Sequence, residues 1–318
     1  MKSLSKLLLA AACLAGNAHA AWPDKPIKFV VPYSAGGAAD ALARTVATEL
    51  GMRLKQQVIV ENKPGAGGTI GAQSVATAPA DGYTFLYDAT SFAVNPSLYP
   101  KLPFDYGKDF LPVSMVARIP TLLVVPSSSP FKTVADLVQH ARANPARLSY
   151  GSAGNGGAAH LSAELFKQGH KVAIVHIPYR GGAPALADLA GGQVDMMFSA
   201  VTASGPLVKG GRLRVLATAF DRRLEAMPDI PTIAESGLKG FGAYEWNAIF
   251  APAGTPGDVI KRMEAEMKDV LATPAMRERL AALGALPAAG GAKELGDFVR
   301  AESAKWATVI KTSQIKVD

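Results

Sequence analysis

The stretch Val30-Val31-Pro32-Tyr33-Ser34-Ala35-Gly36-Gly37-Ala38-Ala39-Asp40 decides the fold, because it runs from an apolar strand through a Gly-Gly turn into a helix. Leu42, Val46 and Leu50 recur every four residues and indicate the helix, and Gly51 is expected to end it. Such a turn presents unpaired backbone N–H groups at the positive end of the helix dipole. The sequence therefore predicts a place suited to a carboxylate or a phosphate.

The same arrangement recurs twice further along the chain. Residues 148–167 read as a strand, a Gly-rich turn and a helix, and residues 172–190 repeat that order with Tyr179-Arg180-Gly181-Gly182 at the turn. If these helix starts face one another across a cleft, they can hold an anion from both sides with few charged side chains. The alternative is that each Gly pair merely begins a helix.

The first twenty residues are predicted to be a secretion signal. Lys2 and Lys6 give a basic start, residues 7–15 form a short apolar run, and Ala18-His19-Ala20 is a small-residue cleavage site. The apolar run is about half of the roughly 20 residues that a membrane-spanning helix needs. Cys13 leaves lipid attachment open as an alternative. Cleavage after Ala20 is expected to release a chain without cysteine into the periplasm, which excludes disulfides and thiolate metal sites.

Composition narrows the class of protein. The chain has 318 residues, 49% of them apolar, and a formal net charge of +7 to which the leader contributes two lysines. This length is sufficient for two domains with a large core, and the apolar content argues against disorder. Lys and Arg are scattered rather than clustered, so nucleic-acid binding is not predicted. The positive balance indicates a weak preference for small anionic ligands.

Strand and helix signals alternate along the chain, which is typical of an α/β fold with largely parallel sheets. Residues 121–125 read as a strand that enters a second lobe, and residues 246–251 read as the strand that returns, before Thr255 and Pro256 begin a helix. Residues 95–112 read as a Pro-rich connection. We therefore expect lobe 1 to comprise residues 21–122 plus 241–318, and lobe 2 to comprise residues 123–240.

Motifs for catalysis and for nucleotides are weak. Residues 154–159 match a dinucleotide-binding pattern, but no acid ends the following strand, and residues 65–70 lack the lysine of a phosphate-binding loop. A serine within a G-x-S-x-G turn is absent from the sequence. The histidines of the mature chain show no metal-ligand spacing. His160, early in its helix, is expected to order the preceding Gly-rich turn or to contact a ligand.

The sequence resembles a known family, the solute-binding receptors of tripartite tricarboxylate transporters, also called Bug receptors. The resemblance covers essentially the whole mature chain. Its motifs, in order, are Pro32-Tyr33-Ser34-Ala35-Gly36-Gly37, Asn62-Lys63-Pro64-Gly65-Ala66-Gly67-Gly68, Asp81-Gly82-Tyr83-Thr84, Leu102-Pro103-Phe104-Asp105, Tyr150-Gly151-Ser152-Ala153-Gly154, His160-Leu161, Pro178-Tyr179-Arg180-Gly181, Gly191-Gly192-Gln193-Val194-Asp195, and Phe250-Ala251-Pro252-Ala253-Gly254-Thr255-Pro256.

The resemblance implies a periplasmic receptor of the two-lobe, Venus-flytrap kind, with mixed sheets flanked by helices and lobes joined by crossing strands. Such a receptor is a non-catalytic monomer without cofactor or metal. It captures a small organic or aromatic carboxylate and delivers it to membrane subunits of the transporter. Two other readings stay open: an exported α/β enzyme acting on a carboxylated substrate, and a sensory receptor for a membrane kinase.

The resemblance also implies ligand-binding positions in the loops of both lobes. In the first lobe these are Tyr33, Ser34, Gly36, Gly37, Thr90 and Ser91, and in the second lobe they are Ser152, Gly154, Asn155, Gly156, Arg180, Gly181, Gly182, Ser199 and Ala200.

Departures from the family pattern bear on the ligand. Ser199-Ala200 stands where many relatives carry Asp-Asn, which contacts an amino group, so its absence argues for a plain or aromatic carboxylate rather than an amino acid. Arg180 is expected either to pair with a second carboxylate or to lie in solvent. Aromatic side chains that line the site or pack in the core are Tyr87, Phe92, Tyr244 and Trp246.

Overall fold

The computed structural model describes residues 22–317. The expected leader, with Cys13 and the cleavage site at Ala20, lies outside these residues. Among the helices that the structure describes, none has the length and apolar content to cross a membrane.

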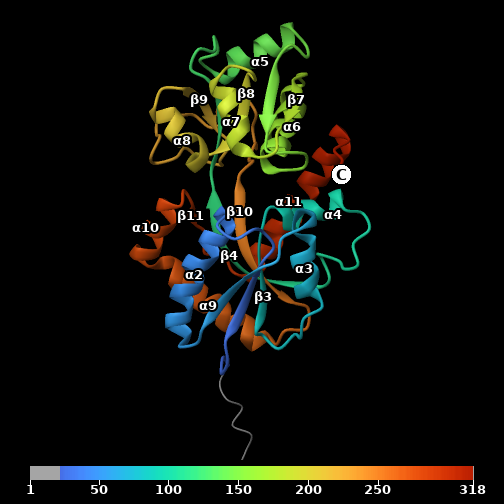
Figure 1. Cartoon of the computed structure of the whole chain (residues 1–318), viewed down its shortest axis with the longest axis vertical. Coiled ribbons are helices and arrows are strands. Elements are labelled where there is room, and N and C mark those ends of the chain that lie inside the picture. The colour runs from blue at the N-terminus through green and yellow to red at the C-terminus, as the bar shows by residue number, and fades with distance from the viewer. Residues whose placement is uncertain (1–21, 318) are drawn as a thin grey trace, which may run out of the picture.

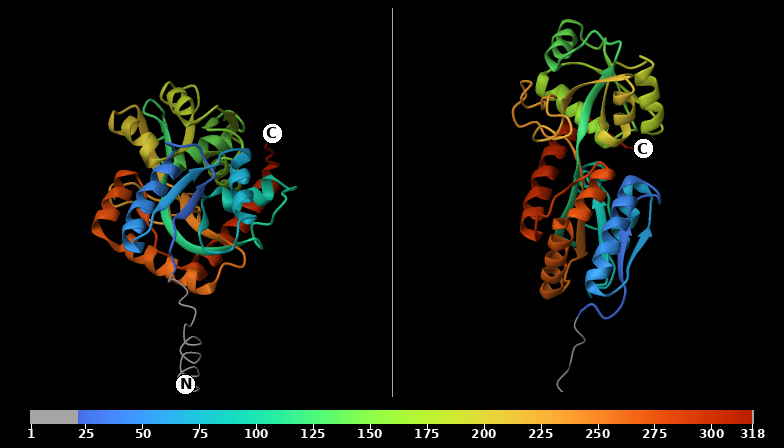
Figure 2. Two further views of the ribbon diagram at one scale, coloured as in Figure 1. Left: turned by 60° about the horizontal axis from the view of Figure 1, so that its bottom comes forward. Right: turned by 90° about the vertical axis from the view of Figure 1, so that its left-hand side faces the viewer.

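Two β-sheets, each flanked by helices, form two lobes (Figures 1 and 2). The first sheet has the strand order β11-β4-β10-β3-β1-β2 and the second β7-β6-β8-β5-β9. The strands of the first sheet are β1 (Ile27–Val31), β2 (Val58–Asn62), β3 (Thr84–Ala89), β4 (Phe110–Ile119), β10 (Glu245–Pro252) and β11 (Leu286–Pro287). Those of the second are β5 (Thr121–Pro126), β6 (Ser149–Ser152), β7 (Val175–Pro178), β8 (Met196–Ala200) and β9 (Leu213–Thr218).

The helices follow the strands in alternation, as the sequence predicts for an α/β fold. They are α2 (Ala38–Leu54), α3 (Thr69–Ala76) with the short 3₁₀ turn η1 (Ala66–Gly68) before it, α4 (Ser91–Leu98), α5 (Val134–Ala143), α6 (Ala158–His170), α7 (Gly182–Ala190), α8 (Val201–Lys209), α9 (Gly257–Ala272), α10 (Pro274–Ala282) and α11 (Ala292–Ser313).

Both sheets are mixed, as the family resemblance implies, whereas the largely parallel sheets expected from the alternation of strands and helices are not found. β1 pairs in parallel with β2 and β3, whereas β10 runs antiparallel to β3 and β4. In the second sheet β6 is parallel to β7 and β8, and β5 is antiparallel to β8 and β9. Antiparallel members arise because β4 and β10 carry the chain out of the first sheet and back into it.

The chain passes between the sheets at two places that lie side by side. It leaves the first sheet after Ile119 and enters the second at Thr121, so the passage falls at Pro120, two residues before the boundary expected at residue 122. It returns at Glu245, which pairs with Ile119. The neck between the lobes in Figure 2 is thus built from neighbouring strands.

The aromatic side chains considered as ligand walls belong mostly to the core. Tyr87, Phe92 and Trp246 are buried, and the Phe92 ring stacks on Phe250 with centroids 3.7 Å apart. Tyr244 is half-buried, and its ring packs edge-on against Phe220. The core-packing interpretation of these residues is therefore correct.

Three local expectations are wrong. Gly51 does not end its helix, because α2 continues to Leu54 and ends at the left-handed Lys55; a side chain at residue 51 would lie 3.1 Å from the Gln56 carbonyl oxygen, which explains a glycine there. The region read as a Pro-rich connection, residues 95–112, contains the second half of helix α4 and the first three residues of strand β4. Pro256 has extended backbone and precedes α9 rather than opening it.

Candidate functional site

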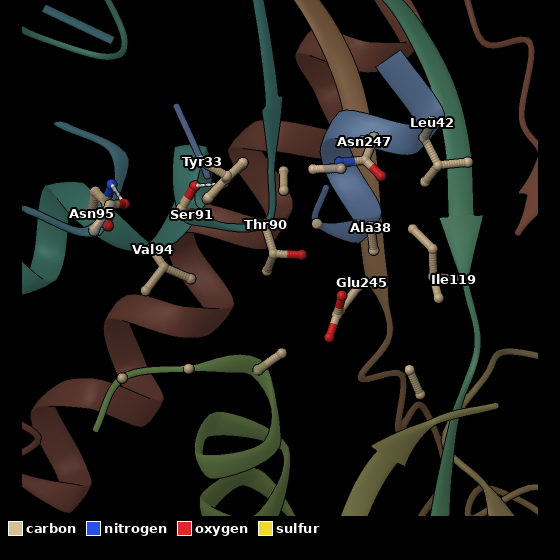
Figure 3. Close-up of a pocket in the computed structure, with 18 of the residues that line it drawn as sticks. Tyr33, Ala38, Leu42, Thr90, Ser91, Val94, Asn95, Ile119, Glu245 and Asn247 are labelled. Carbon is tan, nitrogen blue, oxygen red and sulfur yellow. Dashed lines mark hydrogen bonds between the residues drawn. The ribbon is translucent and has the colours of Figure 1, made fainter. Parts of the chain in front are cut away.

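A cavity of about 490 Å³ lies between the two lobes (Figure 3). Both lobes contribute to its walls, together with the crossing strands β4 and β10. The residues from the first-sheet side are Tyr33, Gly37, Ala38, Ala39, Leu42, Gly67, Ala89, Thr90, Ser91, Val94, Asn95, Leu98, Tyr99, Ile119, Glu245, Asn247, Leu283 and Val317, and those from the second-sheet side are Asn155, Gly156, Gly157, Ala158, Ala200 and Thr202.

Four helices begin at the wall of this cavity. The cavity is lined by the residues that precede α2, α4, α6 and α8, which are Gly37, Thr90, Gly157 and Ala200, and by residues of the first turn of each helix. In none of these four helices does the side chain of the preceding residue form a capping hydrogen bond. First-turn N–H groups without a helical acceptor therefore lie at the cavity, and their dipoles favour negative charge there.

The loop before α2 is held by the Asp40 carboxylate. Asp40 accepts hydrogen bonds from the Gly36 N–H (2.8 Å), Arg44 Nε (3.0 Å) and Asn62 Nδ2 (2.9 Å). Burial favours the neutral acid, but these hydrogen bonds outweigh it and lower the pKa of Asp40 below its ordinary value. The ionised Asp40 thus fixes the loop from behind and leaves the start of α2 to face the cavity.

The Tyr33 side chain in the cavity wall is oriented by Asp88, which is fully buried at the end of β3. Asp88 Oδ1 accepts hydrogen bonds from the Tyr33 hydroxyl (2.7 Å) and the Ser91 hydroxyl (2.8 Å), while Oδ2 has no partner in the described protein. Burial raises the pKa of Asp88 to about 6, and these hydrogen bonds limit the rise. Tyr33 and Ser91 are also in hydrogen-bond contact with each other.

The Gly-rich turn of the second lobe is ordered by two stacked histidines. The Gly156 N–H donates to His160 Nδ1 (3.1 Å), and the His160 and His176 rings stack with centroids 3.9 Å apart. Burial and the neighbouring His176 lower the pKa of His160 to about 4, so the ring is neutral and able to accept. The loop-ordering role expected for His160 is confirmed, and the ring does not line the cavity.

The lobes meet at Gly156. A side chain at residue 156 would lie 2.7 Å from Leu98 Cδ1 and 3.0 Å from Val317 Cγ1, and the backbone there has a φ of +72°. Leu98 ends α4 of the first lobe, and Val317 follows α11. A glycine at this position therefore permits close approach of the two lobes as well as the left-handed turn.

The structure brings about half of the expected ligand-binding residues to the cavity. Those that line it are Tyr33, Gly37, Thr90, Ser91, Asn155, Gly156 and Ala200. Those that the structure does not bring to the wall are Ser34, Gly36, Ser152, Gly154, Arg180, Gly181, Gly182 and Ser199.

Three of the expected residues that do not line the cavity have clear positions elsewhere in the second lobe. Ser152 is fully buried, and its Oγ lies 2.6 Å from His176 Nε2. Ser199 is buried within β8 opposite Leu122. Arg180 is exposed and precedes α7, which follows β7 at the edge of the second sheet, so this third Gly turn lies outside the cavity wall.

Sequence reasoning missed several polar residues of the wall: Asn95, Thr202, Glu245 and Asn247. Glu245 is the most informative, because it is the single charged side chain among the described lining residues. The sequence gives no signal for this position, because an acidic residue directly before an apolar run is equally typical of an ordinary exposed strand end, and the burial of the other seven strand residues is known only from the structure.

Comparisons with known proteins agree with the geometry. The profile of the family described as "Tripartite tricarboxylate transporter family receptor" matches residues 42–315. Protein BugT of Bordetella pertussis is 35% identical over 298 residues, which cover 93% of this chain and 91% of BugT.

Two solved structures from Rhodopseudomonas palustris have the same architecture. Rpa4515 with adipate is 38% identical with a TM-score of 0.79, and the match covers 93% of this chain and 99% of that one. MatC with bound malate is 32% identical with a TM-score of 0.73, and the match covers 91% of this chain and 100% of that one.

Proposed function

The chain belongs to the tripartite tricarboxylate transporter receptor family, and from this membership we propose that it captures a small carboxylate between its two lobes. We propose further that it does so in the periplasm, without catalysis, and hands the ligand to membrane subunits of a transporter.

The observation that carries the proposal is the set of four uncapped helix starts around one cavity. Helix starts bind anions through free backbone N–H groups. Lys, Arg and His are absent from the described lining residues, so the helix starts are the source of positive potential at the wall. One first-turn group is already used at α8, where the Val201 N–H donates to the Pro120 carbonyl, and one at α4, where the Ala93 N–H donates to the Thr90 carbonyl. The starts of α2 and α6 and the other first-turn groups of α4 remain for the ligand.

This arrangement suits reversible capture. Main-chain N–H groups are fixed by their helices, so little conformational entropy is lost when they bind. Waters can bridge those N–H groups that do not reach the ligand directly. Because α2 and α4 belong to one lobe and α6 to the other, a ligand that touches all three stabilises the closed arrangement over an open one.

The ligands named for the similar structures, adipate and malate, are carboxylates and support this ligand class. We propose a carboxylate here also, while its size and its second functional group are set by the side chains of this cavity.

Thermal-shift and calorimetric titration with a panel of mono-, di-, tri- and aromatic carboxylates tests the proposal. A true ligand raises the unfolding temperature by mass action. A panel in which no carboxylate binds would contradict it.

The Gly37→Asp and Gly37→Asn variants place the ligand at the start of α2. Gly37 has a φ of −76°, which admits a side chain, and both residues are favourable before a helix. The Cβ of either variant would lie 3.3 Å from the Ser34 carbonyl oxygen, so this tight contact is the same in both. Asp adds a negative charge that Asn lacks, and at roughly 4 Å this charge opposes a carboxylate by up to about 4 kcal/mol. We expect Asp to weaken binding by at least about 100-fold and Asn by much less. Equal affinity of wild type and Gly37→Asp would remove this helix from the site.

Delivery and location need separate measurements. We expect mass spectrometry of the exported protein to show a mature N-terminus at Ala21, and deletion of the receptor to abolish uptake of the labelled ligand. Unchanged uptake would contradict the transport role without affecting the binding result.

A further inference from the structure

Glu245 is an acidic residue in a cavity otherwise suited to anions. It begins the returning strand β10, pairs with Ile119 of β4, and extends into the cavity between the two lobes (Figure 3). It is the single ionisable carboxyl group among the described lining residues.

The Glu245 carboxyl group has no hydrogen-bond or ion-pair partner among residues 22–317, although the residue is only half-exposed. Burial accordingly raises its pKa. Two cations near the crossing strands have partners other than Glu245. Arg118 of β4, which lies opposite Trp246, pairs with Asp221 (3.2 Å) and lies over the Tyr244 ring, although its buried Nε has no partner among the described residues. Lys305 is bonded to the Gly242 carbonyl oxygen (2.9 Å).

A lone carboxylate in a closing cleft is costly, because closure removes the water that solvates it. Burying an unpaired charge costs several kcal/mol, whereas a charged partner with good geometry recovers most of that cost. Residues 22–317 supply no such partner. Glu245 therefore stays ionised in the closed cleft only if a cation comes with the ligand, whereas a dicarboxylate brings a second negative charge.

We propose that Glu245 is a specificity residue that selects a ligand carrying a cationic nitrogen in addition to its carboxylate, so that the preferred ligand is a small zwitterion. The proposal rests on the proposed function, since the helix starts are what hold the carboxylate end. The cavity then has a positive side at the starts of α2, α4 and α6 and a negative side at Glu245.

This proposal changes the ligand class expected from the sequence. The absence of Asp-Asn at Ser199-Ala200 argued against an amino group in the ligand. In the folded chain Glu245 and Ala200 both line the cavity. An acidic residue is thus present in the cavity wall, but it comes from β10 rather than from β8.

Matched probes test the proposal at neutral pH. Hexanoate, adipate and 6-aminohexanoate share a chain length, and 4-methylpentanoate and leucine share a branched skeleton. We expect calorimetric titration to show the aminated member of at least one set binding about 10-fold or more tightly than its unaminated counterparts. A wild-type protein that binds carboxylates but prefers the unaminated member in both sets would overturn the role of Glu245 and leave the proposed function intact. If no carboxylate binds, both fail.

The Glu245→Gln variant supplies the second measurement, with Glu225→Gln as its control. Glu225 is exposed and lies outside the cavity, so its substitution changes net charge equally. We expect Glu245→Gln to weaken the aminated probe by about 10- to 100-fold with no loss for the unaminated one, and Glu225→Gln to change neither. Equal affinities for the aminated probe in wild type and Glu245→Gln would overturn the proposal. Should Glu245→Gln fail to fold, the wild-type comparison decides.

Discussion

The Tyr33 hydroxyl donates a 2.7 Å hydrogen bond to Oδ1 of Asp88, and this contact joins the loop after β1 to the end of β3. Both elements bear helix starts that line the cavity. Asp88 itself is fully buried behind the wall. The contact therefore fixes the relative position of two helix starts at the cavity through a residue that is not part of the cavity wall.

Replacing Tyr33 by Phe removes this hydrogen bond while keeping the ring. We expect a loss of about 1 kcal/mol in the free energy of unfolding and a several-fold weaker ligand affinity. Chemical denaturation and calorimetric titration measure the two effects. An unchanged affinity would show that the loop keeps its position without Asp88.

Asp88 also predicts a pH dependence of stability. Its pKa is about 6 in the folded chain and 3.8 as an ordinary carboxyl, so the folded state binds more protons between these values. Its contribution to stability therefore rises as the pH falls from 7 to about 4, by on the order of 2–3 kcal/mol. We expect Asp88→Asn to abolish this component, measured as the difference between variant and wild type in denaturation at pH 7.5 and 5. The same difference at both pH values would contradict the assignment.

His160 predicts the opposite sign over a similar range. Its pKa is about 4 in the folded chain and 6.5 ordinarily, so the unfolded state binds more protons and stability falls as the pH drops from 6.5 towards 4. The charged groups beside the stacked ring pair are Glu164 and Lys167. We expect His160→Gln to reduce this loss by on the order of 1–3 kcal/mol. Ligand affinity of the folded wild type should decline only as the pH approaches 4, where the ring becomes protonated and can no longer accept from Gly156.

Gly156 and Gly192 form a matched pair for the contact between lobes. Both have positive φ, +72° and +77°, but a side chain at residue 192 would meet no atom within 4 Å, whereas one at 156 meets Leu98 and Val317. Leu at either position should cost about 1–2 kcal/mol of stability through backbone strain. We expect only Gly156→Leu to weaken ligand binding, by at least about 10-fold, in calorimetric titration. Equal binding by the two variants would mean that this contact does not limit closure.

Helix α5 offers a change in stability that leaves binding intact. Thr133 accepts a hydrogen bond from the Asp136 N–H (3.1 Å), and Asp136 accepts one in return from the Thr133 N–H (2.9 Å). We expect Thr133→Ala to cost about 1 kcal/mol in the free energy of unfolding. Because α5 does not line the cavity, ligand affinity measured well below the unfolding temperature should be that of wild type.

Local signals predicted much of the fold. The Gly turns at 36–37 and 154–157 and the periodic apolar residues of α2 depend on neighbours within a few positions, so the sequence alone is sufficient to predict them. Helix α4 was missed because Pro96 lies inside it, and β4 because Pro112 breaks its apolar run.

The candidate site was less predictable. Gly37 and Gly156 line the cavity, while Gly181 and Gly182, which carry the same local pattern, do not. The difference lies in the sheet order, since β7 is an edge strand and β6 lies one place further in. Glu245 has no local pattern that marks it as a ligand contact.

By itself, the sequence determined where helices begin and which of those beginnings expose main-chain N–H groups, because glycine conformations and apolar periodicity act over one or two turns. The tertiary structure alone decided which beginnings share a cavity and which acid joins them. That choice depends on β4 and β10, whose residues Ile119 and Glu245 pair although more than a hundred positions separate them. Pairing at such a distance is fixed by the packing of the whole chain and not by neighbouring residues.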